Sequence, residues 1–329
     1  MVKILISIIL LSIIVILAIS KKKSEKIGHG GKLNNAIDLL NNGEYEEALN
    51  EFLEIVKMTP RNAQVYKLMG VCCFELKKYK NTLKCLNTSI QYNSEDVECY
   101  YLRIAVFIKF KELENAIRDC DKILELNELN SKAFYYKAYI YNELDDLTNA
   151  LKYIDECIEL NFNEFDAYNL RGLIYGKLGR YTEAIEEFNK AINKNPDECI
   201  YLNNRSFTYI RLKQYENAIN DLNMAIEIDE KIPRIYKNYA HIFLKTSKIT
   251  EAKENIQKAI ELDDSIGDNY IILAAINLYD DDYDSCYENL KQAKSREISY
   301  YDYFDDEMFD KIRDKEEFIE LFQEELDKI

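Results

Sequence analysis

One position of this chain recurs every 34 residues, eight times, without an insertion or a deletion. Small side chains occupy it almost throughout: Ala48, Thr82, Ala116, Ala150, Ala184, Ala218, Ala252 and Cys286. A fixed period of this length is typical of stacked helix–turn–helix units, because such a unit buries its apolar face only against its neighbours. The period therefore predicts an all-α solenoid rather than a single compact core.

Residues 165–198 form the clearest unit, with two apolar faces at helical spacing. The residues on these faces are Tyr168, Gly172 and Tyr175 in the first half and Ala184, Phe188 and Ala191 in the second. Gly179 marks a short turn between the halves, and Pro196 lies where one unit meets the next. A proline at such a junction opens or ends a helix without removing a needed hydrogen bond.

This pattern of large and small residues resembles the tetratricopeptide repeat over residues 29–300. The resemblance implies a right-handed superhelical solenoid of eight 34-residue helix–turn–helix repeats. The expected repeat boundaries are 29–62, 63–96, 97–130, 131–164, 165–198, 199–232, 233–266 and 267–300. Residues 301–329 leave the register, and the apolar spacing of Phe309, Ile312 and Phe318 predicts an acidic C-terminal capping helix.

Residues 1–28 contain an uncharged, Ile- and Leu-rich stretch from Ile4 to Ser20, followed by Lys21, Lys22 and Lys23. Its length and the basic flank predict an uncleaved transmembrane anchor, with the repeats on the cytoplasmic side of the cell membrane. The alternative is export, because Ala18 and Ser20 are small and correctly separated for signal cleavage.

The composition disfavours several classes of function. A net charge of −16 argues against nucleic-acid binding, which depends on Lys and Arg at the phosphates. No Cys-x-x-Cys pair occurs and the only histidines are His29 and His241, so we expect no metal, no cofactor and no enzyme. Cys73, Cys120 and Cys157, with Cys286, fall at core positions of the repeat and predict buried free thiols.

In tetratricopeptide-repeat proteins, positions 2, 5, 6, 9, 12 and 13 of each first helix are the usual contact points on the concave face. These positions form two groups of candidate residues. The aromatic group comprises Tyr101, Tyr135, Tyr136 and Tyr139. The polar group comprises Asn169, Lys177, Asn203, Asn204, Arg211, Arg234, Lys237, Asn238, His241 and Lys245.

The polar group suits an extended peptide, because amides bind a peptide backbone and basic side chains hold carboxylates. The favoured function is a membrane-anchored scaffold that binds a peptide or a partner protein in the concave groove. The alternative is an exported repeat protein that binds a secreted protein or an envelope polysaccharide, with the tyrosines stacked on sugars. A further ladder at position 7, formed by Arg103, Lys137, Arg171 and Arg205, is expected to pair with acidic residues between stacked repeats.

Overall fold

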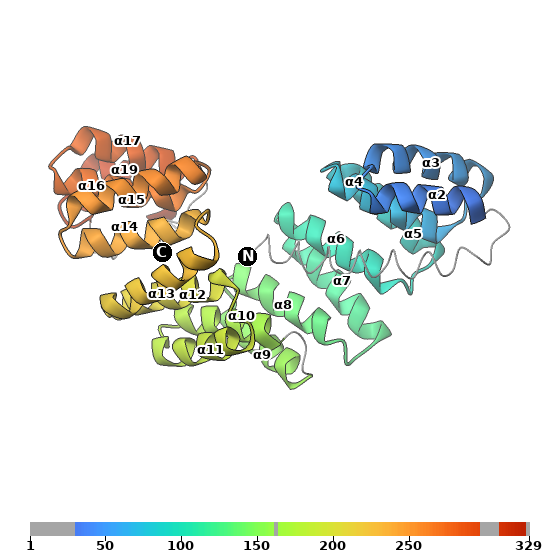
Figure 1. Ribbon diagram of the computed structural model, residues 1–329, viewed down its shortest axis with the longest axis horizontal. Coiled ribbons are helices and arrows are strands. Elements are labelled where there is room, and N and C mark those ends of the chain that lie inside the picture. Colours follow the sequence, from blue (N-terminus) through green and yellow to red (C-terminus); the bar gives the residue numbers. More distant parts are fainter. Residues whose placement is uncertain (1–29, 161–163, 297–308, 327–329) are drawn as a thin grey trace. The chain divides into compact units, whose positions relative to one another are not determined.

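The computed structural model describes residues 30–160, 164–296 and 309–326. The described residues form eight consecutive helix pairs and one further C-terminal helix, which confirms the predicted all-α array (Figure 1). The pairs are α2 (Gly30–Asn41) with α3 (Tyr45–Met58), α4 (Ala63–Glu75) with α5 (Tyr79–Tyr92), α6 (Val97–Lys109) with α7 (Leu113–Leu126), α8 (Ser131–Glu143) with α9 (Leu147–Glu159), α10 (Glu164–Lys177) with α11 (Tyr181–Lys194), α12 (Cys199–Arg211) with α13 (Tyr215–Ile228), α14 (Pro233–Lys245) with α15 (Ile249–Leu262), and α16 (Gly267–Tyr279) with α17 (Tyr283–Lys294). The C-terminal helix is α19 (Glu316–Leu326).

The chain divides into two compact units, residues 1–162 and 163–329. The first unit contains the helix pairs from α2 to α9. The second contains the pairs from α10 to α17, together with α19.

Each pair closes tightly where position 8 of the first helix meets position 24 of the second. A Cβ atom added to Gly70 would lie 2.9 Å from Cδ2 of Leu86, and one added to Gly172 would lie 2.7 Å from Cε1 of Phe188. Real Cβ contacts are longer than this, so a side chain at either glycine would displace Leu86 or Phe188.

In every pair, a residue with a left-handed backbone follows the first helix, at position 15 of the repeat. The φ angles lie between 56° and 81° at Gly43, Lys77, Lys111, Asp145, Gly179, Lys213, Ser247 and Asp281. At the end of α10 the amide of Arg180 donates to the carbonyl of Tyr175 (2.9 Å) and that of Gly179 to the carbonyl of Gly176 (3.1 Å). These two bonds form a Schellman motif, which satisfies carbonyls at the end of the helix and reverses the chain.

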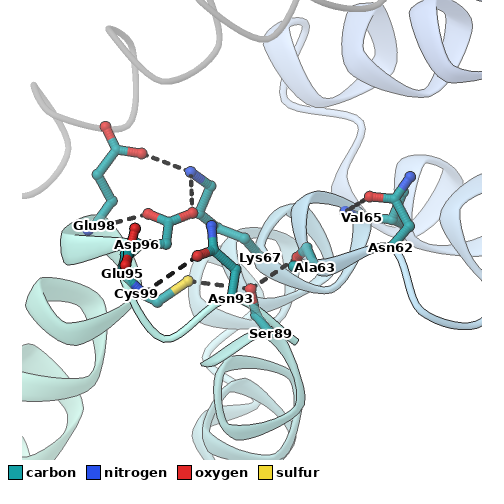
Figure 2. Close-up of polar contacts among 10 residues, drawn as sticks. All are labelled: Asn62, Ala63, Val65, Lys67, Ser89, Asn93, Glu95, Asp96, Glu98 and Cys99. Atoms are coloured by element: carbon teal, nitrogen blue, oxygen red, sulfur yellow. Dashed lines mark hydrogen bonds and ion pairs between the residues drawn. The ribbon is translucent and has the colours of Figure 1, made fainter. Parts of the chain in front are cut away.

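Polar contacts join neighbouring repeats, as Figure 2 shows for the α4–α6 junction. Lys67 is buried on α4, and its Nζ lies 2.9 Å from Asp96 and 2.7 Å from Glu98, at the start of α6. Below this pair the Cys99 thiol donates to Ser89 Oγ (3.3 Å), which donates to a backbone carbonyl of α4 (2.7 Å). A buried cation is tolerated here because two carboxylates face it.

The pairing of the position-7 ladder agrees with the prediction only in part, because several of its ion pairs lie within one repeat. Nε of Arg103 donates to Asp119 (2.7 Å), and Nε of Arg205 donates to Asp221 (2.8 Å). Both partners belong to the second helix of the same repeat, because they lie 16 residues later. Arg171 pairs with Glu187 in the same way.

Lys137 pairs with an acidic residue of the preceding repeat, with its Nζ 2.6 Å from Asp121. Two arginines also bind amides of the preceding repeat: Nη1 of Arg103 donates to Asn87, and Nη1 of Arg205 donates to Asn189. The ladder therefore binds the two helices of a repeat together as well as joining repeats.

The predicted cap is confirmed. Phe309, Ile312 and Phe318 are fully buried and share one apolar cluster with residues of α15, α16 and α17. Nζ of Lys294 donates to the carbonyl of Leu321 (2.5 Å), which fixes α19 to the last pair. The C-terminal residues thus cover apolar surface that a further repeat would otherwise bury.

The predicted core cysteines are also confirmed, since Cys73, Cys120, Cys157 and Cys286 are buried and reduced. The apolar segment 4–20 lies outside the described residues. Within the described ranges no helix is both long and apolar enough to span a membrane.

Candidate peptide-binding face

In the second unit the first helices of successive repeats lie against one another. Contacts join α10 to α12, α12 to α14, and α14 to α16. These helices therefore form one continuous surface, which we call the first-helix face. A ligand laid across this face contacts several repeats at once.

Position 5 of a first helix reaches toward position 2 of the next first helix, 31 residues later. Lys67 Nζ binds Glu98 (2.7 Å), and Lys237 Nζ binds Asp268 (3.1 Å). At the corresponding place in the α6–α8 junction, Lys132 Nζ lies 4.3 Å from the ring centroid of Tyr101. Positions 5 and 2 of consecutive first helices therefore meet at each of these junctions. The lysine binds a carboxylate at two of them and lies over an aromatic ring at the third.

Position 5 also meets position 6 of the next first helix, 35 residues later. At the α10–α12 and α12–α14 junctions amides occupy this contact: Asn204 Nδ2 donates to Asn169 Oδ1 (2.8 Å), and Asn238 Nδ2 donates to Asn203 Oδ1 (3.0 Å). Asn238 is 2% exposed, and its Oδ1 accepts no hydrogen bond in the part of the chain that the structure describes. Such an acceptor is unfavourable while buried and without a donor.

The charge of the first-helix face is opposite to that of the chain. Helices α12 and α14 contain no carboxylate, although the chain carries a net charge of −16. Their bases are Arg205, Arg211, Arg234, Lys237 and Lys245. The paired helices α13 and α15 carry six acidic residues. Acidic side chains are therefore segregated to the second helices here.

An exposed aromatic ring lies among these bases. Phe207 of α12 is 39% exposed, and Nζ of Lys237 lies 5.8 Å from the centroid of its ring. Asn204 lies one turn before Phe207 on the same helix face, and Arg211 lies one turn after it. We call the set Asn204, Phe207, Arg211, Arg234 and Lys237 the α12–α14 face.

Models of the tetratricopeptide repeat match residues 33–81, 131–164, 165–198, 201–232 and 233–266, which together exceed half of the sequence. The chain belongs to the tetratricopeptide-repeat family. Members of this family are generally non-catalytic scaffolds for protein–protein interaction. No curated protein matches the sequence at a significant level.

Solved structures with a similar fold superpose on the chain at low sequence identity. A tetratricopeptide repeat protein from Parabacteroides merdae gives a TM-score of 0.63 at 18% identity, covering 70% of this chain and 92% of its own. The APC/C hetero-tetramer Cut9–Hcn1 gives 0.60 at 15% identity, covering 84% of this chain and 56% of its own. Yeast Tom70 gives 0.57 at 16% identity, with coverage of 84% and 62%.

The tetratricopeptide-repeat register placed the polar candidates on the first helices, but the structure separates them into three groups by exposure. The buried members are Asn169, Asn203, Asn238 and His241, and the three asparagines bind an amide of a neighbouring repeat. Exposed members lie at the rim of the face, and these are Lys177, Arg211 and Arg234. Asn204, Lys237 and Lys245 are half-buried. The exposed cations are therefore the members most accessible to a ligand.

The aromatic candidates are core residues of the first unit. Tyr101, Tyr135, Tyr136 and Tyr139 are all 7% exposed or less. The Tyr101 ring centroid lies 5.5 Å from that of Tyr136, and the Tyr101 hydroxyl donates to Asn130 Oδ1 (2.6 Å). These rings pack against one another and leave little surface on which a sugar ring can stack.

Phe207 was absent from the sequence-based candidates, although it lies at position 9. The signal that would have found it is a large apolar side chain at a contact position, one turn from Asn204 on one side and Arg211 on the other. Its exposure, however, depends on how neighbouring helices pack, and a single sequence does not report this.

Proposed function

We propose that this tetratricopeptide-repeat protein is a non-catalytic scaffold that binds an acidic, extended segment of a partner protein on the α12–α14 face. The observation that carries the proposal is the segregation of charge. Two adjacent first helices contain five bases and no carboxylate in a chain of net charge −16. Arg205 and Lys237 pair with Asp221 and Asp268 of adjacent helices, whereas Arg211 and Arg234 make no ion pair within the described residues. A cationic surface on an anionic protein matches an anionic partner.

Individual contacts support this assignment. Arg234 is exposed and makes no ion pair within the described residues, while Arg211 Nε reaches only the Tyr181 hydroxyl (3.3 Å). Both guanidinium groups are thus available to carboxylates. Asn204 is half-buried beside these cations, and an amide is a side chain that can bind a peptide backbone. Exposed ion pairs contribute about 0.2–1 kcal/mol each, so recognition requires several of them together.

Removal of exposed charge from the first-helix face, at α12, α14 and the adjacent α10, tests the proposal. The site variant Lys177→Ala, Arg211→Ala, Arg234→Ala is compared with the control variant Lys253→Ala, Lys291→Ala, Lys315→Ala, whose residues are exposed and lie outside the first helices. Both variants lose three positive charges. The probe is a fluorescein-labelled peptide of alternating Glu and Ser, followed by fluorescence anisotropy.

We expect the wild-type protein and the control variant to bind the probe equally. The site variant should bind at least tenfold more weakly. Equal weakening in both variants would mean that only the overall charge matters. Absence of binding by the wild-type protein would refute the proposed function.

We also propose that residues 4–20 tether the scaffold to the cell membrane, with the repeats in the cytoplasm. The proposal depends on the uncharged apolar run and on the three lysines that follow it. Protease added outside intact cells should leave the repeats uncut. Cleavage of the repeats under these conditions would favour the exported form of the protein.

A further inference from the structure

We propose that the α12–α14 face selects acidic segments that carry a large apolar side chain two residues from a carboxylate. In this arrangement Phe207 contacts the apolar side chain, while Arg211 and Arg234 contact carboxylates. The inference rests on the proposed function, and adds a side-chain specificity to it.

Phe207 differs from the residues at the same register position in other repeats. Position 9 is occupied by Val71, Ala105, Tyr139, His241 and Ala275 in five other repeats, and each of these is 6% exposed or less. Phe207 is 39% exposed, on a helix whose other large side chains are mostly buried or half-buried. Repeat packing therefore does not account for the ring, and its surface is open to an apolar partner.

The surroundings of the ring define the chemistry of the partner. Lys237 Nζ approaches the ring from α14, and Arg211 follows it by one turn on α12. No carboxylate is present on either helix, and the carboxylate nearest to Lys237 is that of Asp268 on α16, with which it pairs (3.1 Å). An apolar group that lies on Phe207 is thus close to cations, and the segment that carries it is expected to be acidic.

The spacing of the motif follows from helix and strand geometry. Phe207 and Arg211 are four residues apart, which is about 6 Å along the helix axis at 1.5 Å per residue. An extended peptide advances about 3.3 Å per residue and places every second side chain on the same side. A peptide running along α12 therefore presents an apolar side chain and a carboxylate to these two residues when they are separated by one residue.

Three peptides with blocked ends test the inference by fluorescence anisotropy. The matched peptide is Gly-Ser-Glu-Ser-Phe-Ser-Glu-Ser-Gly. The shifted peptide, Gly-Ser-Ser-Glu-Phe-Glu-Ser-Ser-Gly, has the same composition but adjacent Phe and Glu. The third peptide has Ser in place of Phe in the matched sequence. All three carry the same charge.

We expect the wild-type protein to bind the matched peptide at least tenfold more tightly than the other two. The Phe207→Ala variant should bind all three equally. The control variant Met224→Ala removes a side chain of similar exposure (43%) from the second helix α13, and should keep the preference. Unfolding midpoints of both variants are measured alongside, since exposed side chains contribute little to stability.

The outcomes separate this inference from the function on which it rests. If the wild-type protein binds the three peptides equally, or Phe207→Ala keeps the preference, the apolar selection is refuted although acidic binding stands. If the shifted peptide binds as tightly as the matched one, the proposed spacing is refuted. If the glutamate–serine probe itself does not bind, the proposed function fails first.

Discussion

Position 15 of each repeat requires a left-handed backbone, yet six of the eight repeats lack glycine there. A residue with a Cβ atom is disfavoured in this conformation by about 1–2 kcal/mol, whereas glycine adopts it freely. Lys77 is exposed and has a φ of 57°. Gly179 has a φ of 72°, and a Cβ atom added to it would meet nothing within 4 Å.

The left-handed conformation leads to opposite predicted changes in stability at these two positions. Lys77→Gly should stabilise the protein by about 1 kcal/mol, and Gly179→Ala should destabilise it by a similar amount. Urea unfolding followed by circular dichroism measures both changes. The explanation from backbone conformation would be wrong if the two substitutions shifted the unfolding midpoint in the same direction.

Lys132 is a lysine whose burial has a consequence for stability. Its Nζ lies between the Tyr101 and Tyr136 rings, at 4.3 and 5.9 Å from their centroids. Loss of hydration lowers the pKa of Lys132 to about 8, against a small opposing effect of Glu98. An unfolded lysine has a pKa of about 10.4, so between pH 8 and that value the unfolded chain binds more protons. The contribution of Lys132 to stability therefore rises with pH through this window.

Replacement of this lysine tests whether its contribution to stability rises with pH. Lys132→Gln should be more stable than the wild-type protein at pH 7, and the difference should shrink as the pH rises toward 10. Urea midpoints at pH 7 and 9.5 provide the measurement. Lys80→Gln changes an exposed lysine of the same unit and serves as the control. A difference that stays constant with pH would contradict the lowered pKa.

At the scale of the helix, α10 contains two glycines with different roles. Gly172 faces Phe188 of α11 so closely that a Cβ atom would lie 2.7 Å from its ring, whereas a Cβ atom on Gly176 would meet nothing within 4 Å. Gly172→Ala should therefore destabilise the protein by about 1–3 kcal/mol through overpacking. Gly176→Ala should stabilise it by up to about 1 kcal/mol through helix propensity.

Thermal unfolding of the two single variants distinguishes these effects. The double variant Gly172→Ala, Phe188→Leu should regain part of the loss, because the smaller side chain makes room for the methyl group. Destabilisation of the same size at both glycines would show that helix α10 itself, rather than its packing on α11, is sensitive to substitution.

Much of the helical architecture could be predicted because the same register positions carry the same physical demand in each repeat. The small residues at positions 8 and 20 and the apolar cap residues Phe309, Ile312 and Phe318 are examples. The partners of the charged ladder could not be predicted. Periodicity places Arg103 on a helix face, but Asp119 of its own repeat and Asn87 of the preceding one are both within reach of that face.

At the scale of the whole molecule, periodicity likewise did not predict which residues of the candidate site contact one another. The register predicted that Asn169 and Asn204 lie on first helices, and they do. It did not reveal that the two amides bind each other across a repeat junction (2.8 Å). Contacts between residues 31 and 35 apart occupy many groove positions, and they leave Arg211, Arg234 and Phe207 as accessible groups. Which side chains remain for a ligand is decided by neighbouring repeats.

The charge of the whole chain and the charge of the α12–α14 face act on an acidic partner over different distances. The net charge of −16 repels an anionic peptide at long range, while the bases on α12 and α14 attract it at short range. The screening length is about 30 Å at 0.01 M salt and about 10 Å at 0.1 M. Moderate salt therefore removes the long-range repulsion before it weakens contacts within the bound complex.

We accordingly expect the association rate of the glutamate–serine probe to pass through a maximum near 0.1 M NaCl. The dissociation rate should rise steadily with salt, because screening weakens the ion pairs at Arg211 and Arg234. Stopped-flow anisotropy between 0.01 and about 0.5 M NaCl measures both rates. For the site variant, which lacks the local cations, the association rate should rise with salt and show no maximum. A steady fall in the wild-type association rate would mean that the local cations dominate the field at every distance, and the segregation of charge would then extend well beyond α12 and α14.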